Sequence, residues 1–135
     1  MPLTDDDLTF LRAPRLGFLT VYADRRPRPP VPVWFEADPG GVQLFSTADS
    51  PKVERCRRAD GASLVAANVP GEPEHWVAVS GPVTIATDGA FELSSRLADR
   101  YWDMSDPGHL AAVESWRTAD LVRIVIAADR VRRYG

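Results

Sequence analysis

Short, mostly apolar runs recur along the chain and are separated by polar turns, which is typical of strands. β-Branched and aromatic residues are frequent in these runs, and Pro, Gly and Asp residues separate them. Gly81 and Pro82 fall inside the longest run and predict a strand that bends or bulges there. The predicted strands cover residues 15–23, 28–36, 42–45, 62–68, 75–86 and 121–127, with 131–134 as an extension of the last.

Helix signals interrupt these runs. Thr4 followed by Asp7 forms a potential capping box before an apolar side, and Ser50 followed by Pro51 is a favourable cap and first helical residue. Asp88 is the expected cap of a longer helix. The predicted helices cover residues 4–12, 50 to about 59, 88–102 and 107–116.

The order of elements is helix, three strands, helix, two strands, two helices and a final strand. Short turns such as 24–27 and 38–41 favour antiparallel pairing, and about six strands are enough to close a small barrel. Strands and helices do not alternate strictly, which argues against a doubly wound parallel sheet. We therefore predict a mainly β (α+β) fold, a six-stranded antiparallel barrel with peripheral helices, in one domain over residues 1–135.

Composition narrows the classes of function. The net charge of −3 and the pI near 5.3 argue against a nucleic-acid-binding protein. The sequence shows neither a signal peptide nor an apolar run long enough to span a membrane, so we expect a cytoplasmic protein with no membrane partner. Cys56 is the only cysteine, and His75 and His109 are far apart, so we expect no zinc site or other metal site.

The proline-rich stretch 27–35 is the first candidate for a binding surface. Four prolines between positions 27 and 32 remove four backbone donors, which a central strand does not tolerate. The strand is therefore predicted to lie at a sheet edge. It either protects that edge against aggregation, or it lies along a planar ligand beside the indole of Trp34.

The segment 45–52 is the second candidate, because it contains Lys52, the only lysine among 16 basic residues. A helix beginning after Ser50 directs free N–H groups and Lys52 toward one point, which suits a phosphate. The alternative is an ordinary capped surface helix with a solvated lysine. Trp76 is a further candidate, since it begins the bent strand directly after a loop with Pro and Gly, where a pocket mouth is expected.

Catalytic side chains are not evident. Ser80 and Gly81 lack the nucleophile elbow of serine hydrolases, and Glu74–His75 is an isolated pair. We therefore predict no catalytic residue, and expect a cofactor to supply the reactivity of any enzyme built on this chain.

Taken in order, the segments 4–35, VQLFSTADSPKVERCRRADGASLVA, WVAVSGPVTI and VRIVIAADRVRRYG resemble the pyridoxamine 5′-phosphate oxidase-like split β-barrels, which bind flavin or deazaflavin. The resemblance implies that the cofactor phosphate is held by Ser46, Thr47, Ser50 and Lys52. It also implies that Val31, Pro32, Val33 and Trp34 lie along the cofactor ring and that Trp76 approaches the ring or its ribityl chain. Homodimers with two cofactor sites at the interface are expected.

One departure separates this chain from the flavin-using oxidases of vitamin B6. Their second strand carries an Arg and a Lys that hold the FMN phosphate, and the matching positions here are Pro30 and Phe35. The chain is more similar to proteins that bind the deazaflavin coenzyme F-420, which implies hydride transfer from C5 of the reduced cofactor to an electron-poor small molecule.

Three alternatives stay open at this point. They are an FMN-dependent oxidoreductase, a non-catalytic flavin- or haem-binding module with His75 or His109 as an axial ligand, and a purely structural dimer.

Overall fold

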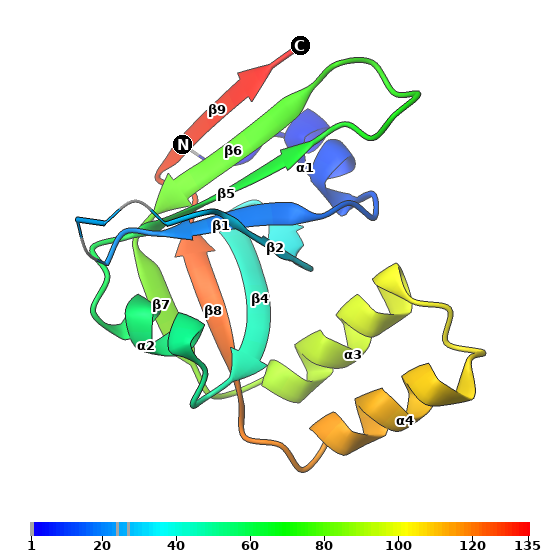
Figure 1. Ribbon diagram of the computed structural model, residues 1–135. Coiled ribbons are helices and arrows are strands. Elements are labelled where there is room, and N and C mark those ends of the chain that lie inside the picture. The colour runs from blue at the N-terminus through cyan, green and yellow to red at the C-terminus, as the bar shows by residue number, and fades with distance from the viewer. Residues whose placement is uncertain (1, 24, 27) are drawn as a thin grey trace.

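The computed structural model describes residues 2–23, 25–26 and 28–135, which form four helices and nine strands (Figure 1). The helices are α1 (Asp5–Arg12), α2 (Pro51–Arg57), α3 (Ala90–Tyr101) and α4 (Pro107–Trp116). The strands are β1 (Gly17–Val21), β2 (Val31–Val33), β3 (Glu36–Asp38), β4 (Gly41–Thr47), β5 (Ala62–Ala67), β6 (Trp76–Gly81), β7 (Val83–Ala86), β8 (Leu121–Ala127) and β9 (Arg130–Tyr134). Asp24 and Pro27 of the predicted turn lie outside the described residues.

All the strand pairs are antiparallel and belong to two sheets. One sheet has the order β2-β1-β5-β6-β9 and the other the order β3-β4-β8-β7. The two sheets cross in space (Figure 1) and share one apolar core, to which Leu64 and Val79 contribute from the first sheet and Leu44 and Ile124 from the second. The mainly β class with peripheral helices is confirmed, although the described residues form nine strands where the sequence predicted six.

The predicted single strand over 28–36 is wrong. Its residues divide between β2, which pairs with β1, and β3, which pairs with β4 in the other sheet. Trp34 and Phe35 connect the two strands, and the Phe35 side chain is fully buried in the core. A run of extended backbone can pass from one sheet to the next without any change in its apolar pattern, so the pattern did not reveal the crossing. The edge position is confirmed, because β2 is the outermost strand of its sheet.

The predicted bend at Gly81–Pro82 is confirmed, because the chain leaves the first sheet as β6 and enters the second as β7. A Cβ atom on Gly81 would lie 2.1 Å from the carbonyl oxygen of Ala127, so only glycine fits this crossing. The predicted extension of strand 121–127 by 131–134 is wrong. The chain changes sheet after β8, and β9 pairs with β6.

Helix capping follows the sequence at two of three predicted sites. Thr4 and Asp7 form the reciprocal capping box, with N···O distances of 2.9 and 3.2 Å, and Ser50 caps α2. Asp88 does not cap α3. The helix begins after Gly89, whose φ is 73°, while Asp88 instead accepts hydrogen bonds from Arg123.

The helices lie outside the barrel, α2 against β4 and β7 and α3 against β4 and β8, with α4 packed on α3 (Figure 1). No helix in the described part of the chain combines the length and the apolar content needed to cross a lipid bilayer.

Candidate functional site

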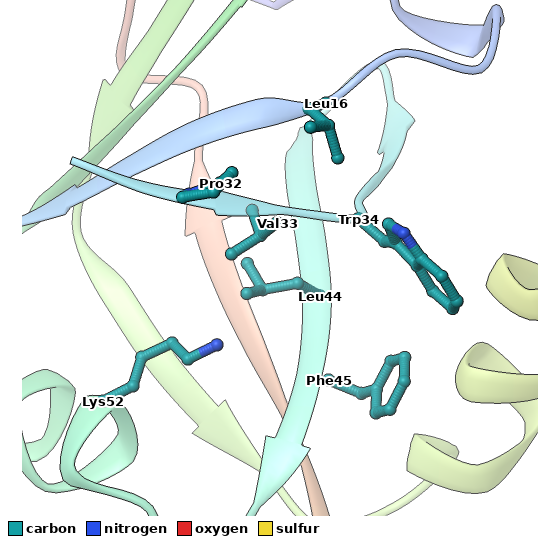
Figure 2. A pocket seen from close by; sticks show the side chains of 7 residues that line it. All are labelled: Leu16, Pro32, Val33, Trp34, Leu44, Phe45 and Lys52. Carbon is teal, nitrogen blue, oxygen red and sulfur yellow. The ribbon is translucent and has the colours of Figure 1, made fainter. Parts of the chain in front are cut away.

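Residues of β2, β4 and α2 surround a cavity of about 360 Å³ (Figure 2). A cavity of this size is at the lower end of the range for small-molecule sites. Its walls are mostly apolar, with a single charged side chain. The lining residues are Leu16, Pro32, Val33, Trp34, Leu44, Phe45 and Lys52.

Lys52 is the charged residue of this cavity, and its side chain extends from α2 into the space (Figure 2). The side chain is half-buried, and no carboxylate or hydrogen-bond acceptor among the described residues pairs with its ammonium group. Burial lowers the pKa of Lys52 from its ordinary value; the Cys56 thiol opposes this shift and the Arg55 cation adds to it. A half-buried cation without a partner is unfavourable in the free protein and favourable for an anionic ligand.

A second, much smaller cavity of about 20 Å³ adjoins the first and shares Lys52 with it. Thr20 on β1, Arg28 before β2 and Arg55 on α2 also line this space. Its volume is sufficient for about one water-sized group. The two cavities together therefore form an apolar chamber with a cationic end.

The serine and threonine residues predicted to hold a phosphate lie beside this cationic end but do not line either cavity. The hydroxyl oxygens of Ser46 and Ser50 are 2.9 Å apart, and that of Ser50 also accepts the N–H of Val53 at 3.2 Å. Thr47 is exposed at the end of β4. In this geometry Ser46 and Ser50 position the start of α2, and Lys52 is the predicted phosphate residue that reaches the cavity.

The N-terminus of α2 offers less than the sequence predicted. The helix has only seven residues, its first residue is Pro51, and Ser50 already accepts the N–H groups of Val53 and Glu54. Few free backbone donors are left to contact an anion. Any anion bound here would therefore depend mainly on side-chain cations.

The four predicted ring-contact residues of the proline-rich strand divide between the two cavities. Pro32, Val33 and Trp34 line the large cavity and Val31 lines the small one. Phe35 is completely buried in the core, so this position cannot hold a phosphate as a lysine would.

Trp76 is not brought to either cavity. It lies at the start of β6, two strands beyond β1 in the five-stranded sheet, and stacks on Tyr134 with ring centroids 6.3 Å apart and planes 12° apart. Within one chain, Trp76 and Trp34 therefore belong to different surfaces.

Sequence reasoning missed three residues of the large cavity, Leu16, Leu44 and Phe45, and left open the role of Arg55, which lines the small one. Phe45 could have been found, because it is the last apolar residue before the polar turn that leads to Lys52. Leu16 carried no such signal, since its contact with the cavity depends on how β1 lies next to β2.

Neither histidine lines either cavity beside Lys52, and His75 instead lines a separate cavity of about 290 Å³. The His75 ring packs edge-on against Phe10 at 4.5 Å, and the His109 ring stacks on Trp102 at 4.3 Å. Among the described residues, no three His, Cys, Asp or Glu side chains are grouped so that they could hold a metal ion.

No protein-family model and no curated protein matches this chain. Solved structures do match. A conserved hypothetical protein from Mycobacterium tuberculosis is 17% identical over 98% of this chain and 84% of its own, with a TM-score of 0.76. An F-420 reductase is 24% identical over 98% of both chains, with a TM-score of 0.71. A candidate pyridoxamine 5′-phosphate oxidase from Listeria innocua is 18% identical over 96% of this chain and 95% of its own, with a TM-score of 0.69.

The chain has the split β-barrel fold. The resemblance drawn from the sequence is thereby confirmed at the level of the fold, which extends over nearly the whole chain. Identities below 25% leave the cofactor and the reaction to be argued from the site itself.

Proposed function

We propose that the protein binds a phosphorylated deazaflavin or flavin in the chamber and acts as an oxidoreductase, with coenzyme F-420 as the cofactor. The observation that carries this proposal is the half-buried ammonium group of Lys52, which has no partner among the described residues and lies at the end of an apolar cavity. A ligand that joins a flat apolar ring system to an anionic group matches both parts of the chamber.

The residues present fit such a cofactor. Lys52 would pair with the phosphate, with Arg55 and Arg28 lining the adjoining space. Pro32 and Val33 would form the apolar wall along the ring, and their strand is the outermost of its sheet in the described part of the chain. Ser46, Thr47 and Ser50 would contribute hydroxyl donors at the start of α2. The hydroxyl groups of Ser46 and Ser50 are already hydrogen-bonded to each other.

The choice of deazaflavin over FMN rests on the second strand. The positions that carry an Arg and a Lys in the flavin-using oxidases are occupied by the exposed Pro30 and the buried Phe35. FMN is the second candidate, since the cations around the small cavity suit its phosphate equally well.

When bound in reduced form, a deazaflavin supplies a hydride at C5 for an electron-poor small molecule. The protein would contribute binding, orientation and exclusion of water, and no side chain is assigned a catalytic role. The apolar residues Val33, Leu44 and Phe45 would keep water away from the ring.

We further propose that the protein is a homodimer formed through the outer face of the five-stranded sheet. Cross-strand register aligns Phe18 with Val65 and Ala78 on that face, and Phe18 is 42% exposed. The stacked Trp76 and Tyr134 lie on the same sheet, where Trp76 could reach a cofactor only in the other subunit. Exposed apolar surface of this kind is typical of interfaces. We expect the dimer to be cytoplasmic and to act on a small molecule rather than on nucleic acid.

The test is titration of the purified protein with coenzyme F-420 and, separately, with FMN, followed by quenching of tryptophan fluorescence. Trp34 in the cavity wall is the expected reporter. Dissociation constants in the micromolar range or below for the deazaflavin alone would support the proposal, and tight binding of FMN alone would move it to the flavin alternative. Binding without turnover of any electron-poor acceptor would favour a non-catalytic module, and failure of both cofactors to bind would refute the function.

A further inference from the structure

Two aromatic side chains form the side of the chamber opposite Lys52, and they come from different parts of the fold. Trp34 lies in the connection between β2 and β3, and Phe45 lies on β4. Figure 2 shows both rings on the side that faces α3 and α4. No residue of these two helices lines the cavity itself.

The hairpin of α3 and α4 nevertheless holds both rings. The Trp34 ring stacks on Tyr101 at 5.2 Å with an interplanar angle of 1°, and Trp102 meets its edge at 4.8 Å and 89°. On the other side, Phe45 packs on Trp116 at 5.1 Å. Trp102 and Trp116 stack on each other at 5.7 Å. A continuous chain of rings therefore runs from Trp34 in the cavity wall, through the hairpin, and back to Phe45 in the same wall.

Polar contacts hold this ring chain in place. The Nδ1 atom of His109 is 2.8 Å from the carbonyl oxygen of Asp103, and the His109 ring stacks on Trp102 at 4.3 Å. The Tyr101 hydroxyl donates to the carbonyl oxygen of Arg15 at 2.7 Å, which ties α3 to the residue before Leu16 in the cavity wall. These two contacts therefore anchor the half of the ring chain that contains Trp34 and Trp102.

We propose that the α3–α4 hairpin determines ligand selectivity by fixing the planes of Trp34 and Phe45. Trp102 and Trp116 are positioning residues: they make the chamber prefer flat aromatic anions to flexible anions of the same charge. Rings that are already held in place lose little conformational freedom when an aromatic ligand packs on them, whereas a flexible chain gains nothing from their fixed planes. This inference rests on the proposed function only in taking the chamber as the ligand site.

The test compares two anionic probes that differ in shape, 8-anilinonaphthalene-1-sulfonate and octyl sulfate. Their dissociation constants are measured by calorimetry for the full chain and for Trp116→Leu, Trp116→Phe and Leu110→Ala. The Leu110→Ala variant is the matched control, because Leu110 lies on α4, is 52% exposed and does not line the cavity. Far-UV circular dichroism checks that each variant retains its helices.

We expect Trp116→Leu to weaken binding of the aromatic sulfonate by about two- to tenfold, which is the range for loss of one aromatic pair, and to leave octyl sulfate unchanged. Trp116→Phe keeps a ring at this position and should retain most of the preference for the aromatic probe. Leu110→Ala should have no effect on either probe. If Trp116→Leu unfolds the hairpin, the smaller change Trp116→Phe still has to reduce the preference in part. Equal losses for both probes, or no loss for either, would overturn the inference.

A fourth variant, Lys52→Met, separates this inference from the proposed function. It should weaken both probes, since both carry a negative charge, and if neither weakens then the chamber is not the anion site and both proposals fall. If the aromatic preference depends on Trp116 while neither flavin nor deazaflavin binds, the inference stands and the proposed function is refuted.

Discussion

Replacing Lys52 by methionine tests the site most directly. Methionine keeps the length and most of the apolar stem of the side chain but removes its charge, so the cavity wall is preserved. The ammonium group has no ion-pair partner among the described residues, so its removal leaves no carboxylate exposed or unpaired within the described fold. A change in ligand binding would therefore report on the ammonium itself.

The expected loss follows from the burial of this cation. A charge-assisted hydrogen bond contributes about 1.5–3 kcal/mol, so the cofactor should bind about ten- to a hundredfold more weakly to Lys52→Met. Thermal stability should be unchanged or slightly raised, because burial of the ammonium group disfavours the folded state. Weaker binding together with undiminished stability is the combination that distinguishes a ligand-binding lysine from a structural one.

The pH dependence gives a second measurement of the same group. The pKa of Lys52 is lowered in the folded protein, so between that pKa and the ordinary value of 10.5 the unfolded chain binds more protons than the folded one. Wild-type stability should therefore gain from Lys52 as pH rises through this window, and Lys52→Met should lack that gain. Anion affinity should fall over the same window in the wild type.

The assay is calorimetric titration with coenzyme F-420 and FMN at neutral and alkaline pH. Lys52→Arg keeps the charge and should retain most of the affinity at neutral pH, whereas Arg57→Met removes an exposed charge of the same helix as a matched control. An unchanged dissociation constant in Lys52→Met would refute the site. An equal loss of affinity in Arg57→Met would refute it as well, because the effect would then come from the overall charge of α2 rather than from Lys52.

Three further predictions concern the fold and the assembly. Gly81→Ala should lower the free energy of unfolding in urea by about 1–3 kcal/mol or more, because the new Cβ would meet the Ala127 carbonyl oxygen; unchanged stability would contradict the tight crossing. Asp7 is buried against Arg133, which lowers the pKa of its carboxyl from 3.8 to about 2, so its contribution of about 2 kcal/mol should be lost as pH falls from about 4 to 2. Asp7→Asn should be less stable near neutral pH and lose less in acid, and parallel acid-unfolding curves would disprove this pairing. Phe18→Glu should convert the proposed dimer to a monomer in light scattering, and a wild type that is already monomeric would refute the proposed interface.

Much of the local structure could be predicted because its causes lie within a few residues. Thr4 with Asp7, and Ser50 with Pro51, mark helix starts through contacts that span only three positions. The prolines before Val33 exclude a central strand wherever the strand lies, since they lack N–H groups. The Gly81–Pro82 bend was readable for a similar reason. The prediction that Asp88 caps α3 was wrong, because Asp88 pairs with Arg123, which is 35 residues away in the chain.

The candidate site was predictable only in part. Lys52 and the strand beside Trp34 stood out through residue type and resemblance, and the structure brings them to one cavity. Phe45 carried a local signal, as the last apolar residue before the turn that leads to Lys52, and the tertiary structure brings it to the cavity. The role of the α3–α4 hairpin could not be predicted from the sequence, because Trp102 and Trp116 contact the rings that line the cavity rather than the cavity itself.

The sequence by itself determined the helix starts, the edge character of the proline-rich strand and the location of the only lysine, because these depend on local hydrogen bonding and residue chemistry. The tertiary structure alone decided that residues 28–36 cross between sheets at Phe35, that β9 leaves the line of β8, and that Trp76 lies away from Lys52 within one chain. An extended segment has the same alternating pattern whichever sheet it joins. Burial of a side chain such as Phe35 depends on every strand packed around it, and no local pattern contains that information.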